Sequence, residues 1–305
     1  MRVAGAVDIG GTRTKVGIVA EDGSIVSRAV ISTSARGDPV PLVEQIVSAL
    51  QPLLNAQRAG ALGAGQRSVV GVGVSVAGFL DRDHDVMIEN ANLPALCGFP
   101  LRAALEEKLG LGCRLEVDSN ASTLAEHRFG AGRGSARLLG VTVGTGLGGG
   151  VIIDGSVLRY TGECAGDLGH IILEPGGRRC SCGAQGCLEA LVCSAALSER
   201  AGGRSTREIV SSARRGEQLA VDALAHVGRL LGLGLASLSP LFAPDTIVVG
   251  GGVAAAGELL LEPTRDSYRV HATPTFRENV RIVGASFGGW EGMVGAASLL
   301  FDPVE

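Results

Sequence analysis

The amino-acid sequence predicts an α/β protein built from two related lobes. Its 305 residues exceed one domain of roughly 150 residues and can bury two cores. Near the start, the glycine turn GGTR joins two strand-like stretches, and the same layout of strand, turn and strand returns in RLLGVTVGTGLGGGVIIDG. A layout that repeats along a chain indicates two lobes of the same construction, and two lobes offer a cleft between them.

The first lobe is expected to begin with three antiparallel strands and a helix. Apolar stretches over residues 3–9, 14–20 and 24–31 alternate with short turns, which is typical of neighbouring strands. Over residues 39–58 apolar side chains recur at helical spacing, and the apolar run at 68–78 predicts a buried strand. These elements follow the order β-β-β-α-β.

A short strand that ends at Asp118, followed by a helix with apolar side chains on one side, marks the expected boundary between the lobes. We therefore assign residues 1–117 to an N-terminal lobe and residues 118–289 to a C-terminal lobe. The final helix, within residues 290–305, has no partner of its own and is expected to pack back on the first lobe.

The composition narrows the class of protein. Hydrophobic residues make up 46% and charged residues 19% of the chain, without an uninterrupted apolar run of the ~20 residues that a membrane span needs. A globular protein that does not bind membranes is therefore expected. The net charge of -4 disfavours nucleic acid as a partner, because it leaves no general basic surface. Seven cysteines, an odd number, favour reduced thiols and a cytoplasmic location.

The first glycine turn has the features of a phosphate loop. It lies between two strands, which argues against a dinucleotide fingerprint and against a Walker A loop. Glycines such as Gly10 and Gly11 let backbone N–H groups approach a phosphate, Thr12 adds a hydroxyl, and Asp8 could hold Mg²⁺ through water. Taken alone, the motif fits an ordinary hairpin turn with a capping aspartate equally well.

Two further glycine runs favour the interpretation of the first turn as a phosphate loop over an ordinary hairpin turn. Residues 144–150 form a second glycine turn between strands, at the matching point of the second lobe. Two such turns on facing lobes would clamp a polyphosphate. The third run, at 250–252, follows an apolar strand and precedes a helix. It could leave room for a flat adenine, although close packing of helix and sheet is the competing explanation.

A metal site is predicted from one histidine and three cysteines: His170, Cys180, Cys182 and Cys187. One imidazole and three thiolates give a closed tetrahedral shell, which indicates structural rather than catalytic Zn²⁺. A closed shell also argues against redox or hydrolase activity at the metal. The alternative is a loop of free thiols beside a core histidine.

Asp118 is the candidate general base. A carboxylate at a strand end can accept the proton of a substrate hydroxyl while that oxygen attacks the γ-phosphate. Its alternative role is to cap the helix that follows.

Together these strings resemble the repressor, open-reading-frame and kinase (ROK) family, which includes bacterial glucokinases. The likeness covers nearly the whole chain: DIGGTRTK and VTVGTGLGGGVI resemble the phosphate loops, IVVGGGVA the adenosine segment, EVDSNASTLAE the segment of the base, and GHIILEPGGRRCSCGAQGCLEA the zinc signature. The resemblance implies an actin-like ATPase (ribonuclease H-like) fold. It also implies a homodimeric sugar kinase that uses ATP, Mg²⁺ and a structural Zn²⁺.

The resemblance also assigns roles one residue at a time. The implied cofactor-binding residues are Asp8, Gly10, Gly11, Thr12, Lys15, Gly144, Thr145, Gly146, Gly250, Gly251 and Gly252. The implied sugar-binding residues are Gly78, Asn92, Asp118, Asp167, His170 and Glu189. Some family members are repressors with an N-terminal helix-turn-helix domain, whereas here the phosphate loop begins at Asp8, which favours an enzyme.

Two positions depart from the family pattern. Val117 replaces the asparagine beside the base, and Asp167 replaces a glutamate three residues before the zinc histidine. Losing a hydrogen-bonding group from a polar site should change the preferred substrate. An N-acetylhexosamine or a carbocyclic sugar analogue is therefore an alternative to a hexose, and a non-catalytic sugar-binding protein is a third possibility.

Overall fold

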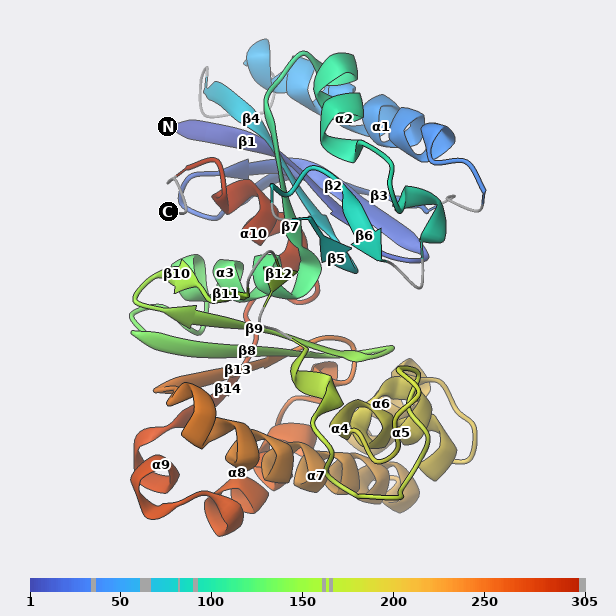
Figure 1. Ribbon diagram of the computed structural model, residues 1–305, viewed down its shortest axis with the longest axis vertical. Coiled ribbons are helices and arrows are strands. Elements are labelled where there is room, and N and C mark those ends of the chain that lie inside the picture. Colours follow the sequence, from blue (N-terminus) through green and yellow to red (C-terminus); the bar gives the residue numbers. More distant parts are fainter. Residues whose placement is uncertain are drawn as a thin grey trace. The chain divides into compact units, whose positions relative to one another are not determined.

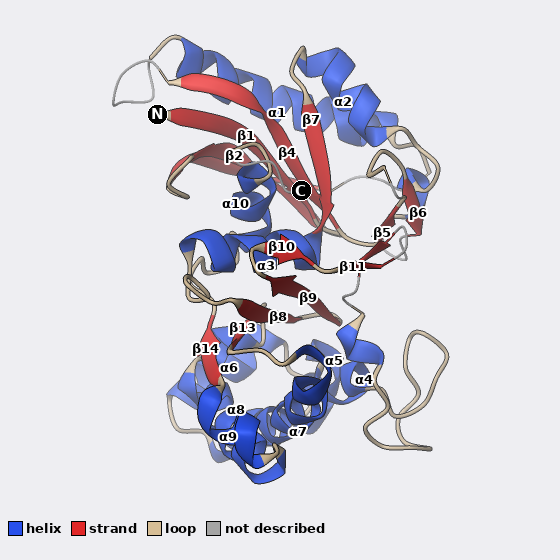
Figure 2. Ribbon diagram, turned by 60° about the vertical axis from the view of Figure 1, so that its left-hand side comes forward, coloured by secondary structure: helices blue, strands red, loops and turns tan. Residues whose placement is uncertain are grey.

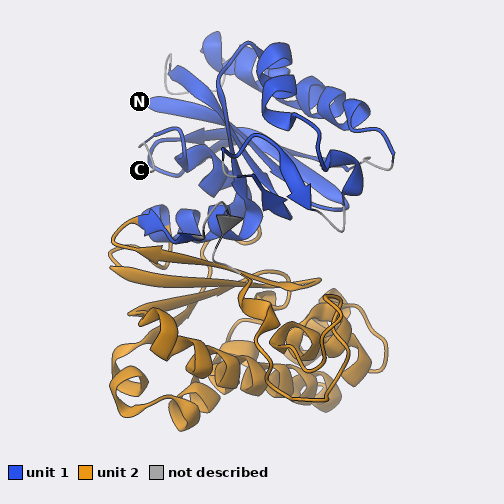
Figure 3. Ribbon diagram, viewed as in Figure 1, with its two compact units in different colours: residues 1–129, 156–164, 290–305 blue, residues 130–155, 165–289 orange. Residues whose placement is uncertain are grey.

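The computed structural model describes residues 1–33, 37–60, 67–81, 83–89, 93–160, 163–164 and 167–301 (Figure 1). The chain divides into two compact units, coloured separately in Figure 3. The first comprises Met1–Phe129, Ser156–Cys164 and Trp290–Glu305, and the second comprises Gly130–Gly155 and Ala165–Gly289.

The first unit is organised around a five-stranded sheet of order β3-β2-β1-β4-β7. Strand β1 pairs antiparallel with β2 and parallel with β4, which pairs parallel with β7. The strands of this unit are β1 (Arg2–Ile9), β2 (Arg13–Ala20), β3 (Ile25–Ser32), β4 (Ser68–Val76), β5 (Phe79–Leu80), β6 (Met87–Glu89), β7 (Cys113–Val117), β11 (Arg159–Tyr160) and β12 (Glu163–Cys164). The three predicted antiparallel strands are confirmed as β1, β2 and β3.

Helices cover both faces of this sheet (Figure 2). They are α1 (Val40–Arg58), α2 (Leu101–Leu109), α3 (Asp118–Phe129) and α10 (Glu291–Ser298), with a short 3-10 turn η1 (Pro94–Leu96). Helices α1 and α2 lie on one face, while α10 packs against β1 and β4 on the other. Residues 3–7 of β1 are therefore all buried, as expected for a strand that is covered on both sides.

Helix α3 belongs to the first unit, so the division differs from the expected boundary after residue 117. The reason is its packing against α10, which is so close that a Cβ on Gly295 would lie 1.6 Å from the Ala121 carbonyl oxygen. The segment Ser156–Cys164 also joins this unit, which the sequence did not indicate.

The second unit repeats the same strand plan. Strand β8 pairs antiparallel with β9 and parallel with β13, and β13 pairs parallel with β14. In the first unit β1 pairs in the same way with β2 and β4, and β4 pairs with β7. These strands are β8 (Arg137–Val143), β9 (Leu147–Ile153), β13 (Thr246–Gly250) and β14 (Arg281–Gly284); β10 (Ser156–Val157) follows β9 along the chain. The predicted repeat of the first strands and their glycine turn is confirmed.

The helices of the second unit are η2 (Leu168–His170), α4 (Leu188–Val192), α5 (Ser194–Arg200), α6 (Thr206–Arg214), α7 (Gln218–Phe242), η3 (Ala254–Ala256), α8 (Glu258–His271) and α9 (Pro274–Asn279). By length and composition alone, α7 could cross a membrane, although Asp222 and Arg229 interrupt its apolar residues. However, 56% of its most apolar stretch is buried inside the protein. It also packs along α8, where the Ser239 and Tyr268 hydroxyls meet at 2.8 Å. These contacts are typical of a core helix.

Candidate active site

In the first unit, Asp8 is held in a fixed position near the end of β1. Lys15, directly opposite on β2, donates to the Asp8 Oδ2 at 2.8 Å, and the Ser75 hydroxyl donates to Oδ1 at 3.2 Å. A Cβ at Gly292 of α10 would lie 2.7 Å from the same Oδ1, so only glycine leaves room for this carboxylate. The lysine balances its charge, and both oxygens have fixed donors.

The first glycine turn is closed by its own backbone. The Gly10 N–H donates to the Arg13 carbonyl at 3.1 Å. The Thr33 hydroxyl donates to the Gly10 carbonyl at 2.7 Å, and the Thr33 N–H donates to the Thr12 carbonyl at 3.0 Å. Gly11 and Thr12 are exposed. The turn is therefore a hairpin closed by hydrogen bonds, and its tip is exposed to solvent. A phosphate could approach the backbone at this tip.

Asp118 is the first residue of α3, immediately after β7. Its Oδ1 accepts a hydrogen bond from the Ser119 N–H at 2.7 Å. Burial raises the pKa of Asp118 to about 6, and the nearby Asp8 carboxylate contributes to the rise, while the Ser119 N–H and Lys15 oppose it. A carboxylate with a pKa near 6 is ionised at neutral pH and is a stronger base than an ordinary aspartate.

Three further positions of the first unit were singled out by the sequence. Gly78 follows β4 with φ of +103° and leads into β5, a left-handed conformation that favours glycine. Val117 is 6% exposed and packs in the hydrophobic core of this unit, so the position before Asp118 has no polar side chain. Asn92 lies outside the described residues.

In the second unit, the glycine turn between β8 and β9 is braced by α4 and α5. The Ser194 N–H donates to the Gly144 carbonyl at 2.7 Å. The Glu189 Oε2 accepts from the Leu147 N–H at 3.0 Å, and a Cβ on Gly146 would lie 2.5 Å from that oxygen. Thr145 lies at the tip of this turn, between the two glycines.

Glu189 also reaches the cysteine loop. Its Oε1 accepts from the Ser181 hydroxyl at 2.9 Å and lies 3.5 Å from the Cys180 Sγ. The sequence assigned this residue to the sugar, and both of its carboxylate oxygens also have partners within the unit. It therefore links the predicted metal loop to the second glycine turn.

The glycines of the third run, at 250–252, differ in their surroundings: one packs closely against a strand, and another has open space beside it. Gly251 has φ of +88°, and a Cβ there would lie 2.4 Å from the Val143 carbonyl oxygen, so close packing against β8 explains this glycine. Gly252 has open space around its Cβ position. The Gly250 Cβ position is 3.2 Å from the Ala285 side chain. Of these three glycines, Gly252 alone has no heavy atom within 4 Å of its Cβ position.

Replacing Gly251 with alanine is expected to lower the free energy of unfolding by roughly 1–3 kcal/mol, because the new methyl group would overlap the β8 backbone. Its positive φ adds strain for any residue other than glycine. The matched control is Gly252→Ala, which introduces no close contact. Urea denaturation of both variants is the measurement, and equal midpoints would contradict the packing argument.

The predicted metal ligands come together in the second unit. The potential ligand atoms of His170, Cys180, Cys182 and Cys187 all lie within 4.8 Å of one another. The His170 Nδ1 is 3.6 Å from the Cys180 Sγ, and the Cys182 and Cys187 Sγ atoms are 3.7 Å apart. Zn–S bonds of about 2.3 Å at tetrahedral angles put neighbouring sulfurs about 3.8 Å apart. The residues therefore fit a tetrahedral zinc ion.

The surroundings of this cluster suit a structural ion. The Asp167 Oδ1 lies 3.3 Å from the His170 Nε2, on the far side of the ring from the thiols, where a carboxylate can orient a metal-binding histidine. The Cys180 N–H donates to the Ala184 carbonyl at 2.8 Å, which folds the loop back on itself. The described cysteine side chains, those of Cys97, Cys113, Cys180, Cys182, Cys187 and Cys193, are free thiols. Asp167, which the sequence assigned to the sugar, thus contacts His170, which the sequence assigned to both the metal and the sugar.

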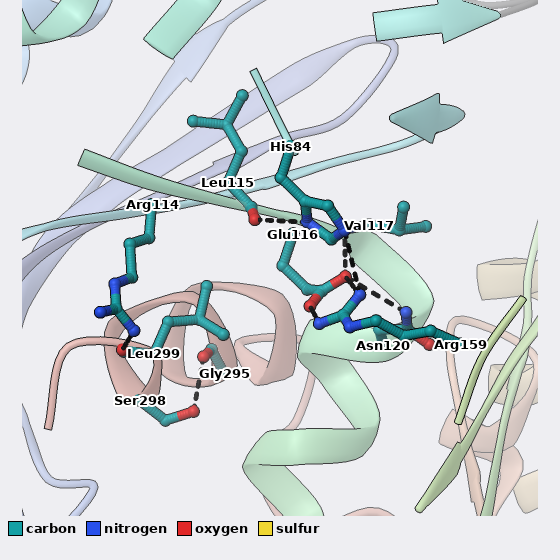
Figure 4. A network of polar contacts seen from close by, with 10 residues as sticks. All are labelled: His84, Arg114, Leu115, Glu116, Val117, Asn120, Arg159, Gly295, Ser298 and Leu299. Atoms are coloured by element: carbon teal, nitrogen blue, oxygen red, sulfur yellow. Dashed lines mark hydrogen bonds and ion pairs between the residues drawn. The ribbon is translucent and has the colours of Figure 1, made fainter. Parts of the chain in front are cut away.

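One polar network close to Asp118 in the sequence was not found by sequence analysis (Figure 4). The buried Glu116 of β7 forms an ion pair with Arg159, and Arg159 also contacts His84. Glu116 lies in the string EVDSN, two residues before the predicted base, which was the available signal. Its partner lies 43 residues away in sequence, and no local pattern connects the two.

A cation–aromatic cluster lies beside the first glycine turn. Trp290, the only tryptophan of the chain, has the Arg28 guanidinium 4.6 Å and the Lys15 ammonium 5.9 Å from a ring centroid. The same lysine binds Asp8. The ring therefore reports on the surroundings of these charged groups.

Two units with one strand plan, each with a glycine turn between its first two strands, define a protein with the actin-like ATPase fold. The model of the ROK family matches residues 4–302, and the chain belongs to this family. It is 33% identical to the glucokinase of Streptomyces coelicolor, over 97% of both chains. It is 29% identical to the glucokinase of Thermotoga maritima, over 96% of both.

Solved structures agree with this assignment. A ROK glucokinase from Streptomyces griseus, in complex with glucose and AMPPNP, is 34% identical with a TM-score of 0.83, covering 98% of this chain and 99% of that one. The E. coli repressor Mlc is 28% identical over 89% of this chain, which spans 70% of the repressor. The resemblance stated from the motifs, and the fold class with it, are confirmed.

Proposed function

We propose that this protein is an ATP-dependent kinase that phosphorylates a hydroxyl of a hexose or hexose-like sugar. The observation that carries the proposal is Asp118, a base with a pKa of about 6 beside the fixed carboxylate of Asp8. Glucokinases align with nearly the full chain, and one of them was solved with glucose and a nucleotide. An ionised Asp118 would take the proton of the attacking hydroxyl.

The other residues would bind the nucleotide. Asp8 would hold Mg²⁺ through water, and the bound ion would balance charge on the phosphates. Lys15 is placed to move from Asp8 to a phosphate oxygen, because it needs only to rotate its flexible stem. The exposed tip of the first turn and the open space at Gly252 would receive phosphates and adenosine.

We propose a structural role for Zn²⁺ at His170, Cys180, Cys182 and Cys187. It would fix the loop whose end carries Glu189 and whose histidine faces Asp167. A cytoplasmic location suits free thiols and the use of ATP. A homodimer is proposed from the family resemblance alone.

A substrate screen tests the proposal. Purified protein with MgATP should phosphorylate at least one member of a panel of aldohexoses, N-acetylhexosamines and cyclitols, measured by ADP release. The apolar, buried Val117 favours sugars with one hydrogen-bonding group fewer near the base. Robust activity on glucose alone would remove the N-acetylhexosamine and cyclitol alternatives. Sugar binding by calorimetry without any ADP release would instead indicate a non-catalytic sugar-binding protein.

Binding of MgATP should change the fluorescence of Trp290, because Lys15 would leave Asp8 for a phosphate and alter the charge above the ring. A titration of intrinsic fluorescence with MgAMPPNP measures this, since the chain has a single tryptophan. The signal should be lost in Lys15→Met. An equal signal in that variant would contradict the proposed movement of the lysine.

A further inference from the structure

Glu116 is a buried charge two residues before the base. Its side chain is 1% exposed, and a carboxylate at that depth is stable only if it is paired and fully hydrogen-bonded. Arg159 provides the pair: its Nη2 donates to Oε2 at 2.5 Å and its Nη1 approaches Oε1 at 3.3 Å. A planar guanidinium that meets both oxygens fixes their orientation as well as their charge.

Arg159 is itself held by His84. The Arg159 Nη1 lies 3.2 Å from the His84 Nε2, and the His84 Nδ1 lies 3.1 Å from the Leu115 carbonyl (Figure 4). This pattern requires a neutral ring that donates from Nδ1 and accepts at Nε2. His84 adopts φ of +56°, a strained value for histidine. Such strain persists only where surrounding contacts impose it.

Glu116 also holds the backbone and a side chain around Asp118. Its Oε1 accepts from the Val117 N–H at 3.0 Å and from the Asn120 Nδ2 at 3.2 Å. Asn120 is fully buried, and its Oδ1 has no hydrogen-bond partner in the described part of the chain. The bond to Glu116 therefore orients this amide. One carboxylate thus contacts the residue before Asp118 and a residue in the turn after it.

We propose that Arg159 is a positioning residue for the reaction: by fixing Glu116, it holds the junction of β7 and α3 so that the Asp118 carboxylate is aimed at its substrate. The inference rests on the proposed kinase function. Arg159 acts through Glu116 and does not need to touch the substrate.

A double-mutant cycle tests this role in the full-length protein. Arg159→Gln should lower kcat about 100-fold, because an error of about 1 Å in a catalytic group costs that much, while the KM for ATP should change less than about threefold. Combining it with Glu116→Gln should recover at least tenfold, since no unpaired buried charge remains. If Arg159 bound the substrate directly, the second substitution would recover nothing. That result, or a kcat for Arg159→Gln within threefold of wild type, overturns the proposal.

The pH profile separates positioning from a loss of folded protein. Asp8 and Lys15 are the charged groups that act on Asp118 in the native protein. In Arg159→Gln the unneutralised Glu116 should move the midpoint of the kcat profile to higher pH, and the double variant should move it back. An unmoved midpoint overturns the proposal, because partial unfolding alone would not shift it. Should Arg159→Gln fail to fold, Arg159→Lys carries the same test with an intermediate loss.

Arg114→Gln is the matched control. Arg114 lies on β7, the strand that also carries Glu116. Its Nη1 donates to the Leu299 carbonyl at 3.0 Å rather than to a carboxylate, so kcat should not change. If the wild-type protein phosphorylates no sugar, the proposed function fails. Hydrogen exchange can then still test whether Arg159, through Glu116, holds the junction of β7 and α3. The N-terminal turn of α3 should then exchange faster in Arg159→Gln and return to the wild-type rate in the double variant.

Discussion

Replacing Asp118 with asparagine should lower kcat by about 10²–10⁴ and leave the protein more stable than wild type at neutral pH. The loss of rate follows from removing a general base. The gain in stability follows from the raised pKa: desolvation and the nearby Asp8 charge make ionised Asp118 unfavourable. A shift from 3.8 to about 6 corresponds to about 1–3 kcal/mol at neutral pH.

The sign of the pH dependence can be checked in two assays. The folded protein binds the Asp118 proton more tightly than the unfolded chain does, so the contribution of this group to stability declines as pH rises from about 4 to 6. Catalytic rate changes in the opposite direction and increases through a midpoint near pH 6, because the base must be ionised. The asparagine variant should show neither transition.

Asp22→Asn is the control for removing a carboxylate. Hydrogen bonds from Ser24 lower the pKa of exposed Asp22, so its ionised form is favourable, and its loss should not stabilise the protein. Its kcat should equal that of wild type. If Asp118→Asn kept more than a tenth of the wild-type kcat on the true substrate, Asp118 would not be the base.

The sequence predicted those features of the fold that depend on local pattern. Strands β1 to β3 and helix α1 follow from the spacing of apolar residues, and the metal cluster follows from four residues of the right type within a short segment. The boundary at residue 117 could not be predicted correctly, because α3 is held by α10, which lies more than 150 residues further along the chain.

The sequence singled out Asp8 and Asp118 by residue type and position, and the structure brings them near enough for the Asp8 charge to raise the pKa of Asp118. The contacts of the candidate site were harder to predict from the sequence where one residue has several partners. Glu189 was assigned to the sugar from the sequence, and the structure adds that its oxygens accept from the Ser181 hydroxyl and the Leu147 N–H. Arg159 belongs to no motif, and only the fold brings it to Glu116. Contacts of this kind depend on distances that no spacing in the sequence encodes.

Removing the proposed zinc ion should have the second of the two largest effects, because the cysteine loop is connected to the second glycine turn through Glu189. Structural zinc sites contribute about 10–16 kcal/mol of apparent binding energy at neutral pH. Without the zinc ion, the thiols of Cys180, Cys182 and Cys187 would lose their common partner, and the loop should open. Glu189 would then lose the support of Ser181 and, with it, a fixed bond to the Leu147 N–H.

Cys187→Ser is the sharpest form of this experiment, because Cys187 is fully buried and directly precedes α4. The variant should lose bound zinc, unfold at a lower temperature and show at least a 100-fold lower kcat/KM for sugar. The KM for ATP should rise as well, since the turn at residues 144–146 loses its brace. Metal analysis, thermal unfolding and steady-state kinetics measure these effects.

Cys97→Ser serves as the matched control, because Cys97 is an exposed free thiol of the first unit. It should keep about one zinc per chain and the wild-type kcat/KM. A Cys187→Ser protein that lost zinc but kept its activity on sugar would separate the metal from the site. In that case the bond between Glu189 and Leu147 would be strong enough to hold the turn without the loop, and the zinc ion would act on stability alone.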